Sequence, residues 1–222
     1  MKPQLISTRY PKSIKSAFGN MVLKPARNNK KLGNGVVKKG RWKGMPLFSV
    51  TLVERETCPS DCIRWDSCYG NNMPFAHRFV VNLDFYETVE KELKALSIKY
   101  PKGFVVRLHI LGDFPHLEYV MFWRMMLVRF SQLHIYGYTA HNPVTNLGGH
   151  IDTQLNRLYP YGKCVIRFSL PLRYNSNGWR YASPKDLGKD SFHCPEQTEK
   201  TESCLTCAAC WESTKTVFFE EH

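Results

Sequence analysis

From residue 45 onward, short apolar runs alternate with helical patterns, and this alternation constrains the fold more than any other feature of the sequence. Apolar runs that predict strands lie at 46–53, 104–111, 134–139 and 164–170, with a further strand or connection at 79–83. Helical periodicity follows at 84–100, 116–132 and 146–158. Strands that alternate with helices predict a parallel sheet with right-handed crossovers. About five strands are too few for a closed eight-stranded barrel, so we expect an α/β fold with an open, partial (β/α) barrel-like sheet.

Two of the helical segments have features that fix their roles. Asp84 and Glu87 are spaced as a capping box at the start of the first one, and Pro101 marks its end. The segment 116–132 is apolar nearly all round, so we expect a buried helix whose Met and Trp residues fill the core.

The loops after the first strands are expected to meet at one edge of the sheet. Ligands of such sheets bind beyond the carboxyl ends of the strands. A loop with Cys58 follows the strand at 46–53, and the turn Gly112-Asp113 follows the strand at 104–111. Tyr138, His141 and Asn142 come at the end of the next strand and are candidate substrate contacts, although polar residues there are often only turns.

The charge of the chain is concentrated in its first 44 residues. This stretch holds twelve Lys and Arg and no Asp or Glu, whereas the remainder balances nineteen basic against nineteen acidic residues. We expect a basic N-terminal arm (1–44), an α/β core (45–190) and a cysteine-rich C-terminal segment (191–222). The glycines around Trp42 suggest a flexible stretch that orders on a partner. Nucleic acid is the expected partner, a solvated tail being the alternative. The candidate contacts are Lys30, Lys31, Lys38, Lys39, Arg41 and Lys43.

The expected compartment is the cytoplasm. No run of eighteen apolar residues predicts a membrane span, and Lys2 is not followed by the apolar region of a secretory signal. The chain has eight cysteines. In a reducing compartment, clustered cysteines more often hold metal or do chemistry than form disulfides.

The first cysteine group is Cys58, Cys62 and Cys68. Three thiolates in one loop suit three corners of a [4Fe–4S] cluster and leave one iron open for a substrate or cofactor. A tetrahedral zinc site needs a fourth ligand, for which His77 is the nearest candidate. Structural free thiols are the remaining alternative.

The second group is Cys194, Cys204, Cys207 and Cys210. Its C-x₂-C-x₂-C run is close to the spacing of bacterial ferredoxins, with Cys194 as a remote fourth ligand. A complete set of four predicts a closed cluster for electron transfer or structure, with zinc as the alternative. The chain is therefore expected to hold one or two [4Fe–4S] clusters. Cys164, within a strand pattern, is expected to be a core thiol.

Two further polar residues have open roles. Asp113 either accepts a hydrogen bond from a cationic group of a ligand or caps the helix that follows it. His109 lies within a strand pattern and is more readily explained as a satisfied buried histidine than as a functional one.

Three motifs in order resemble the phage gene product 88 family, over about residues 45–222. They are Thr57-Cys58-Pro59 with Cys62 and Cys68-Tyr69-Gly70, then Leu111-Gly112-Asp113-Phe114, then Cys194-Pro195-Glu196-Gln197 with Thr201, Cys204, Cys207 and Cys210-Trp211. The resemblance names a group more than an activity. If the protein is phage-encoded, the expected location is the host cytoplasm.

A looser resemblance is to radical S-adenosylmethionine enzymes, which place a three-cysteine loop after the first strand of a partial barrel. It implies a cluster on Cys58, Cys62 and Cys68, although five residues separate Cys62 from Cys68 where the usual loop has two. Gly112 and Asp113 would match the motif that holds the amino group of the cofactor, with Tyr69 as a further cofactor contact. Asp113 and His141 are the candidate catalytic residues, and an electron donor is an implied partner.

Three functions follow as hypotheses. The first is a radical S-adenosylmethionine-like enzyme that acts on nucleic acid or a nucleotide. The second is a non-enzymatic nucleic-acid-binding protein with structural iron–sulfur or zinc sites. The third is a redox or interaction protein that modifies a host process.

Overall fold

The computed structural model describes residues 6–157, 162–170, 181–183 and 188–220 of the chain. Its centre is an eight-stranded sheet with the order β2-β3-β5-β6-β7-β8-β10-β9. Seven strands run parallel, and β2 pairs antiparallel with β3. The predicted α/β fold with an open, mostly parallel sheet is confirmed. The strands of this sheet are β2 (Lys24–Pro25), β3 (Leu47–Ser49), β5 (Phe104–Leu108), β6 (Leu133–Thr139), β7 (Cys164–Ser169), β8 (Tyr181–Ser183), β9 (Ser191–His193) and β10 (Thr216–Phe218).

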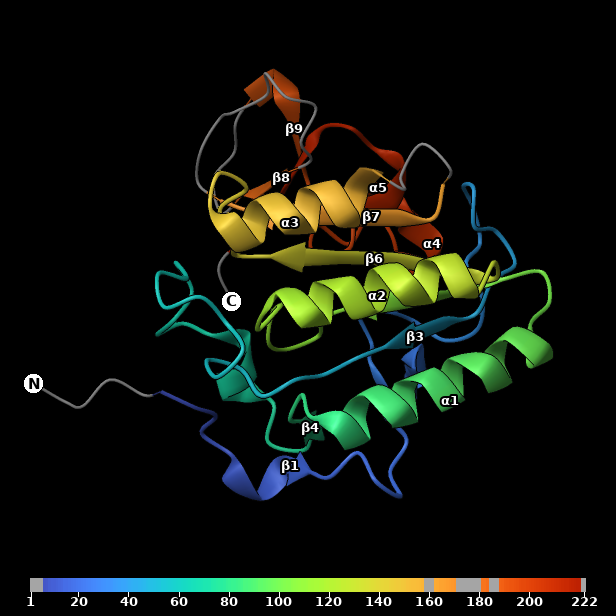
Figure 1. The fold of residues 1–222 in the computed structure, drawn as a ribbon. Coiled ribbons are helices and arrows are strands. Elements are labelled where there is room, and N and C mark those ends of the chain that lie inside the picture. The colour runs from blue at the N-terminus through green and yellow to red at the C-terminus, as the bar shows by residue number, and fades with distance from the viewer. Residues whose placement is uncertain (1–5, 158–161, 171–180, 184–187, 221–222) are drawn as a thin grey trace, which may run out of the picture.

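Three helices cover one face of the sheet, and irregular segments cover the other. The helices α1 (Leu83–Lys99), α2 (Leu117–Arg129) and α3 (Asn146–Gln154) lie next to one another in front of the strands in Figure 1. Strand side chains alternate between faces. Phe104, Val106 and Leu108 of β5 therefore enter the core beneath the helices, where Trp123 and Met126 of α2 fill space as predicted. Val105 enters a second core on the opposite face.

The second core joins the two ends of the chain. Leu32 and Val37 from the N-terminal segment pack with Leu205 and Trp211 from the C-terminal segment against the sheet. The C-terminal segment contains two one-turn helices, α4 (Cys204–Cys207) and α5 (Ala209–Glu212). The sheet is thus the middle layer of three.

The N-terminal segment is part of this fold. Beyond β2, it supplies β1 (Ile14–Lys15), which pairs with β4 (Arg78–Phe79), and the 3₁₀ turns Pro11–Ser13 and Ala26–Asn28. The expectation of a flexible stretch around Trp42 is wrong, because Trp42 is 1% exposed. Apolar residues lie between the basic ones, and their burial holds the segment in place.

Several element boundaries differ from those expected. The N-cap of α1 is Asn82, whose side chain accepts a hydrogen bond from Phe85 N at 3.0 Å, so the capping box at Asp84 and Glu87 was wrong. The strands β3 and β5 end at Ser49 and Leu108, earlier than predicted, because the chain turns into the cysteine loop and the Gly112 turn. The predicted end of the third helix, at 158, lies outside the described residues.

Candidate functional site

A cavity of about 310 Å³ lies at the carboxyl ends of the parallel strands. Both cysteine groups line it. Cys58, Cys62 and Cys68 do so from the loop after β3, and Cys194, Cys204 and Cys210 from the C-terminal segment. The two groups are more than a hundred residues apart in the sequence, and the fold brings them to one space. Its polar lining also includes Arg107, His109, Asp113, Tyr138, Thr139 and Ser169.

The first cysteine loop is tied down by side chains that precede it. Arg55 donates to Trp65 O at 3.0 Å and to Asn71 Oδ1 at 2.8 Å, and thus spans the loop. Thr57 Oγ1 donates to Val53 O at 2.9 Å. The loop ends in the 3₁₀ turn Tyr69–Asn72. Burial raises the pKa of the Cys58 thiol, and the nearby Asp113 carboxylate raises it further. The cysteines thus lie in a loop that is held in shape by hydrogen bonds, and in the absence of a bound cation the neutral form of the Cys58 thiol is favoured.

Arg167 of β7 organises the second cysteine group. Its fully buried guanidinium donates to the carbonyls of Cys210 at 2.8 Å, Ser213 at 2.6 Å and Lys215 at 2.9 Å. Tyr138 donates to Cys210 Sγ at 2.7 Å. Burial, followed by the neighbouring Cys210, raises the pKa of Cys204 to about 12. Cys207 is half-buried and is not among the residues that line the cavity.

The thiols share a cavity but are not yet arranged as ligands. Within the described ranges, no three His, Cys, Asp or Glu side chains lie where they could hold a metal ion together. The donor chemistry nevertheless fits, since three soft sulfur ligands face the cavity from each side, and thiolates select zinc, copper(I) or iron–sulfur clusters.

Two predictions about single residues are decided by the geometry. Cys164 is fully buried in the core beneath the helices, as expected. His77 does not line the cysteine cavity but a separate pocket with Tyr10 and Lys15. Burial and the charges of Lys24 and Lys15 lower its pKa. The structure therefore does not bring His77 to the first cysteine group as a fourth ligand.

Asp113 connects two loops and does not cap the helix. Its Oδ1 accepts from Phe114 N at 2.8 Å, and its Oδ2 accepts from Ala140 N, after β6, at 2.6 Å. The N-cap of α2 is instead His116, which accepts from Tyr119 N. Burial raises the pKa of Asp113, while His141 and these hydrogen bonds oppose the rise. Both carboxylate oxygens already have partners, so this residue holds the rim of the cavity in shape.

Gly112 allows the rim to close against the cysteine loop. It has φ +81°, and a Cβ atom there would lie 2.6 Å from Leu52 Cβ and 2.6 Å from Thr57 Oγ1. Asp113 N also donates to Thr57 Oγ1 at 3.1 Å. The glycine thus allows close packing between the two loops, and this role is independent of the predicted contact with a cofactor.

The other polar residues near the strand ends differ in whether they line the cavity. His141 contacts Phe114 O through Nε2 at 2.8 Å and is not among the cavity-lining residues. Asn142 accepts from Val144 N, which is a turn role. His109 is 5% exposed and its Nε2 lies 2.8 Å from the Tyr119 hydroxyl, but its Nδ1 has no partner among the described residues. The sequence analysis missed Arg107, although an arginine between Val106 and Leu108 could have indicated a polar face of β5.

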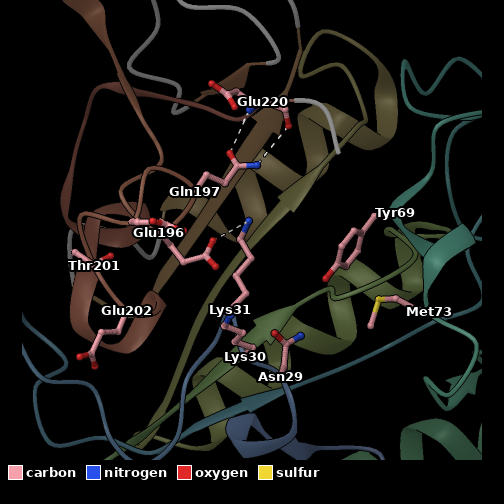
Figure 2. Close-up of a pocket in the computed structure, with 11 residues that line it drawn as sticks. Asn29, Lys30, Lys31, Tyr69, Met73, Glu196, Gln197, Thr201, Glu202 and Glu220 are labelled. Atoms are coloured by element: carbon pink, nitrogen blue, oxygen red, sulfur yellow. Dashed lines mark hydrogen bonds and ion pairs between the residues drawn. The ribbon is translucent and has the colours of Figure 1, made fainter.

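An outer cleft of about 760 Å³ adjoins the cavity. Lys31, Tyr69 and Glu220 line both spaces, so they mark the passage between them. Figure 2 shows Tyr69 and Met73 on one side of the cleft and Glu196 and Glu202 on the other. Lys31 pairs with Glu196 at 3.3 Å. Tyr69, predicted to contact a cofactor, therefore lies at the entrance.

The predicted nucleic-acid contacts divide between two places. Lys30 and Lys31 line the outer cleft. The others lie on a loop at 38–43, directly before β3, and this loop is fixed by Trp42, whose Nε1 donates to Gly162 O at 2.7 Å. Because Gly162 lies two residues before the start of β7, the loop lies at the amino-terminal edge of the sheet, opposite the cavity. Lys38, Lys39 and Lys43 are exposed there, whereas Arg41 pairs with Glu212 at 3.1 Å.

No family model, curated protein or solved structure matches this chain. The resemblances to the phage gene product 88 family and to radical S-adenosylmethionine enzymes therefore remain predictions. In the part of the chain that the structure describes, no helix has the length and apolar character needed to cross a membrane.

Proposed function

We propose that the protein is an iron–sulfur enzyme of radical S-adenosylmethionine-like type that acts on a nucleotide or nucleic acid. The observation that carries the proposal is the convergence of Cys58, Cys62 and Cys68 with Cys194, Cys204 and Cys210 on one cavity at the carboxyl edge of the sheet. The cavity has the size of a small-molecule site. A cofactor and a substrate bound there would lie directly between the two thiol groups.

The strand order supports the same proposal. The strands β3, β5, β6, β7 and β8 are adjacent in chain order, which is the winding of a partial (β/α) barrel. The three-cysteine loop follows the first of these strands, and Gly112-Asp113 follows the second. When bound, the first cluster would supply one-electron chemistry on S-adenosylmethionine. The residues of this chain would orient the bound molecules, with Asp113 and Gly112 holding the rim and the C-terminal segment excluding water.

Metal analysis after anaerobic purification tests the proposal. We expect about eight iron atoms and matching sulfide per chain, as two [4Fe–4S] clusters require, with broad absorption near ~400 nm. Cys58→Ala and Cys204→Ala should each lose about half of the iron. Cys164→Ala is the matched control, because this thiol lies beneath the helices and should leave the iron content unchanged. Zinc without iron would overturn the proposal.

The enzymatic part needs a separate assay. With dithionite as the reductant, the wild-type protein should cleave S-adenosylmethionine, and Cys58→Ala should abolish this cleavage. Cleavage that is unchanged in Cys58→Ala, or absent from wild-type protein with full iron content, would reduce the proposal to a protein with structural or electron-transfer clusters.

A specific observation favours a second function, that of a nucleic-acid-binding protein with structural metal sites. Lys38, Lys39 and Lys43 are exposed on an anchored loop at the edge opposite the cavity. Phosphate contacts there would not deliver a substrate to the thiols. Nucleic-acid binding that persists in Cys58→Ala and Cys204→Ala would support this second function.

A further inference from the structure

Arg107 lies on the floor of the cavity. It sits in β5 between Ser49 of β3 and Tyr136 of β6 in the register of the sheet. Its neighbours Val106 and Leu108 point into the core beneath the helices, so its own side chain points to the other face and lines the cavity. A central strand thus places a permanent cation inside the site.

This guanidinium is unpaired in the described part of the chain. It makes no hydrogen bond or ion pair there, and its buried Nε has no partner. Its guanidinium carbon lies over the Tyr138 ring, 5.7 Å from the ring centroid. Arg78, in contrast, is fully buried and pairs with Glu54 at 2.7 Å, and Arg167 donates to several carbonyls. Arg107 is half-buried, and its Nε is shielded from water without a partner, so an anion in the cavity would supply the missing acceptor and counter-charge.

A second unpaired group faces the same space. His109 is 5% exposed and lines the cavity, its Nε2 is engaged with Tyr119, and its Nδ1 has no partner among the described residues. One ring nitrogen of a neutral histidine donates and the other accepts. Whichever of these roles Nδ1 has, it offers one hydrogen bond to a bound molecule.

The carboxylates of the cavity do not supply the missing anion. Glu54 accepts from Arg78 and from Thr8, and Asp113 accepts from Phe114 N and Ala140 N. Glu220 lies at the passage to the outer cleft, where it faces His193 at 3.4 Å. A bound ligand or the ionised thiols would therefore be the source of a counter-charge for Arg107.

We propose that Arg107 binds an oxyanion, either a carboxylate or a phosphate group, of the molecule that occupies the cavity, and that His109 Nδ1 bonds a neighbouring polar atom of it. The proposal gives the chemical class of the ligand for the function proposed above. It rests on that function only in that both use the same cavity. The competing role is that Arg107 neutralises a metal–thiolate centre at Cys204 and Cys210, which line the same cavity.

Anion titrations of the full chain, purified anaerobically and with its metal content measured, test the proposal. The probes are inorganic phosphate and succinate, each followed by the melting temperature at constant ionic strength. We expect either phosphate or succinate to raise the melting temperature of the wild-type protein. Stabilisation by phosphate would identify the oxyanion as a phosphate group, and stabilisation by succinate would identify it as a carboxylate. Arg107→Met should weaken that binding at least about tenfold. Arg107→Lys keeps the charge but not the paired donors, so its affinity for the anion should lie between those of the wild type and Arg107→Met. His109→Gln is expected to weaken it less than Arg107→Met.

Lys38→Met is the control, because it removes the same charge from the opposite edge of the sheet and should bind the anion as the wild type does. If Arg107→Met does not fold, the comparison rests on Arg107→Lys. Absence of binding by the wild type, or equal affinity in the Arg107 variants, overturns the proposal. Loss of iron in those variants with unchanged anion affinity also overturns it and assigns Arg107 to the metal–thiolate centre. Binding that depends on Arg107 in a protein without iron leaves this inference intact and removes the proposed function instead.

Discussion

Trp42 stacks on Trp211, with their ring centroids 5.2 Å apart and their planes 22° apart. One residue comes from the basic N-terminal segment and the other directly follows the last cysteine. Both rings are buried in the second core. The stack therefore couples the folding of the N-terminal segment to the position of the C-terminal cysteine group.

Trp42→Ala should destabilise the protein by about 3–5 kcal/mol, because it leaves a cavity in this core. It also removes the hydrogen bond from the indole to Gly162 O. Urea denaturation followed by circular dichroism measures the loss. Phe75→Ala is the control, since Phe75 is 93% exposed and its truncation should change stability by less than about 0.5 kcal/mol. Equal midpoints for Trp42→Ala and the wild type would contradict the anchoring role.

Gly112→Ala should destabilise the protein by about 1–3 kcal/mol and lower its iron content. The backbone is left-handed at this position, and the added methyl would collide with Leu52 and Thr57 at the base of the cysteine loop. Gly19→Ala separates the two causes. Gly19 has a similar φ of +74° but nothing lies within 4 Å of its Cβ position, so it should show the strain without the collision. If both variants lose the same stability and iron, packing against the cysteine loop is not what requires Gly112.

The sequence was sufficient for the four strands β3, β5, β6 and β7 and for one side of the site, but the short strands β2, β8, β9 and β10 were not predicted. Alternation of apolar runs with helical patterns is a local signal, and it placed the Cys58 loop and the Gly112 turn at the same edge, where both line the cavity. The helix ends were less predictable, because several residues near 82–87 could act as caps and only the local backbone selects Asn82.

The other side of the site depended on contacts between distant parts of the chain. The C-terminal cysteines reach the cavity because Trp211 packs under Trp42 and Arg167 holds the carbonyl of Cys210. These contacts join residues far apart in the sequence, so no short sequence motif predicts them. The basic composition of the N-terminal segment likewise suggested a free arm, since the charges are conspicuous and the buried residues between them are sparse and without period. Packing across the sheet overrode that composition.

Glu54 links stability to acid pH through its buried pair with Arg78. Burial alone raises the pKa of Glu54, but hydrogen bonds from Arg78, its own backbone and Thr8 outweigh this, and its pKa lies below the ordinary 4.5. The stabilisation is therefore complete above about 4.5 and is lost as the pH falls through the lower folded-state value. Glu54→Gln should cost about 3–5 kcal/mol at pH 7, because it leaves Arg78 buried without its counter-ion. Denaturation midpoints of the two proteins should converge as the pH falls below ~4. A gap that stays constant down to pH ~3 would contradict this.

His109 should give a second acid-sensitive range at higher pH. Burial, and then the charge of Arg107, lowers its pKa from 6.5 to about 3. Between these values the unfolded chain binds a proton that the folded protein does not, so stability falls as the pH falls below 6.5. In the middle of that range the slope is about 1.4 kcal/mol per pH unit for one proton. His109→Gln should lack this slope between pH ~6 and ~4.5, as measured by urea denaturation at several pH values. Equal slopes in both proteins would show that the ring titrates alike in the folded and unfolded states.

The basic loop predicts a salt-dependent affinity for nucleic acid that is independent of the cysteines. Lys38, Lys39 and Lys43 are exposed and are held by the Trp42 anchor, so they can contact phosphates without ordering a flexible segment. Replacing all three by Ala should weaken binding of a DNA duplex and reduce the slope of log K against log salt by roughly 0.9 per lost phosphate contact.

The matched control for this triple variant replaces Lys91, Lys94 and Lys102, which are exposed on and beyond α1 and carry the same total charge. If net charge alone drives binding, both triple variants should lose the same slope. A loss confined to Lys38, Lys39 and Lys43 would instead identify the anchored loop as the contact surface. It would also place nucleic-acid binding at the edge opposite the thiols, so that any reaction on nucleic acid would require the strand to pass around the molecule to the outer cleft at Lys30 and Lys31.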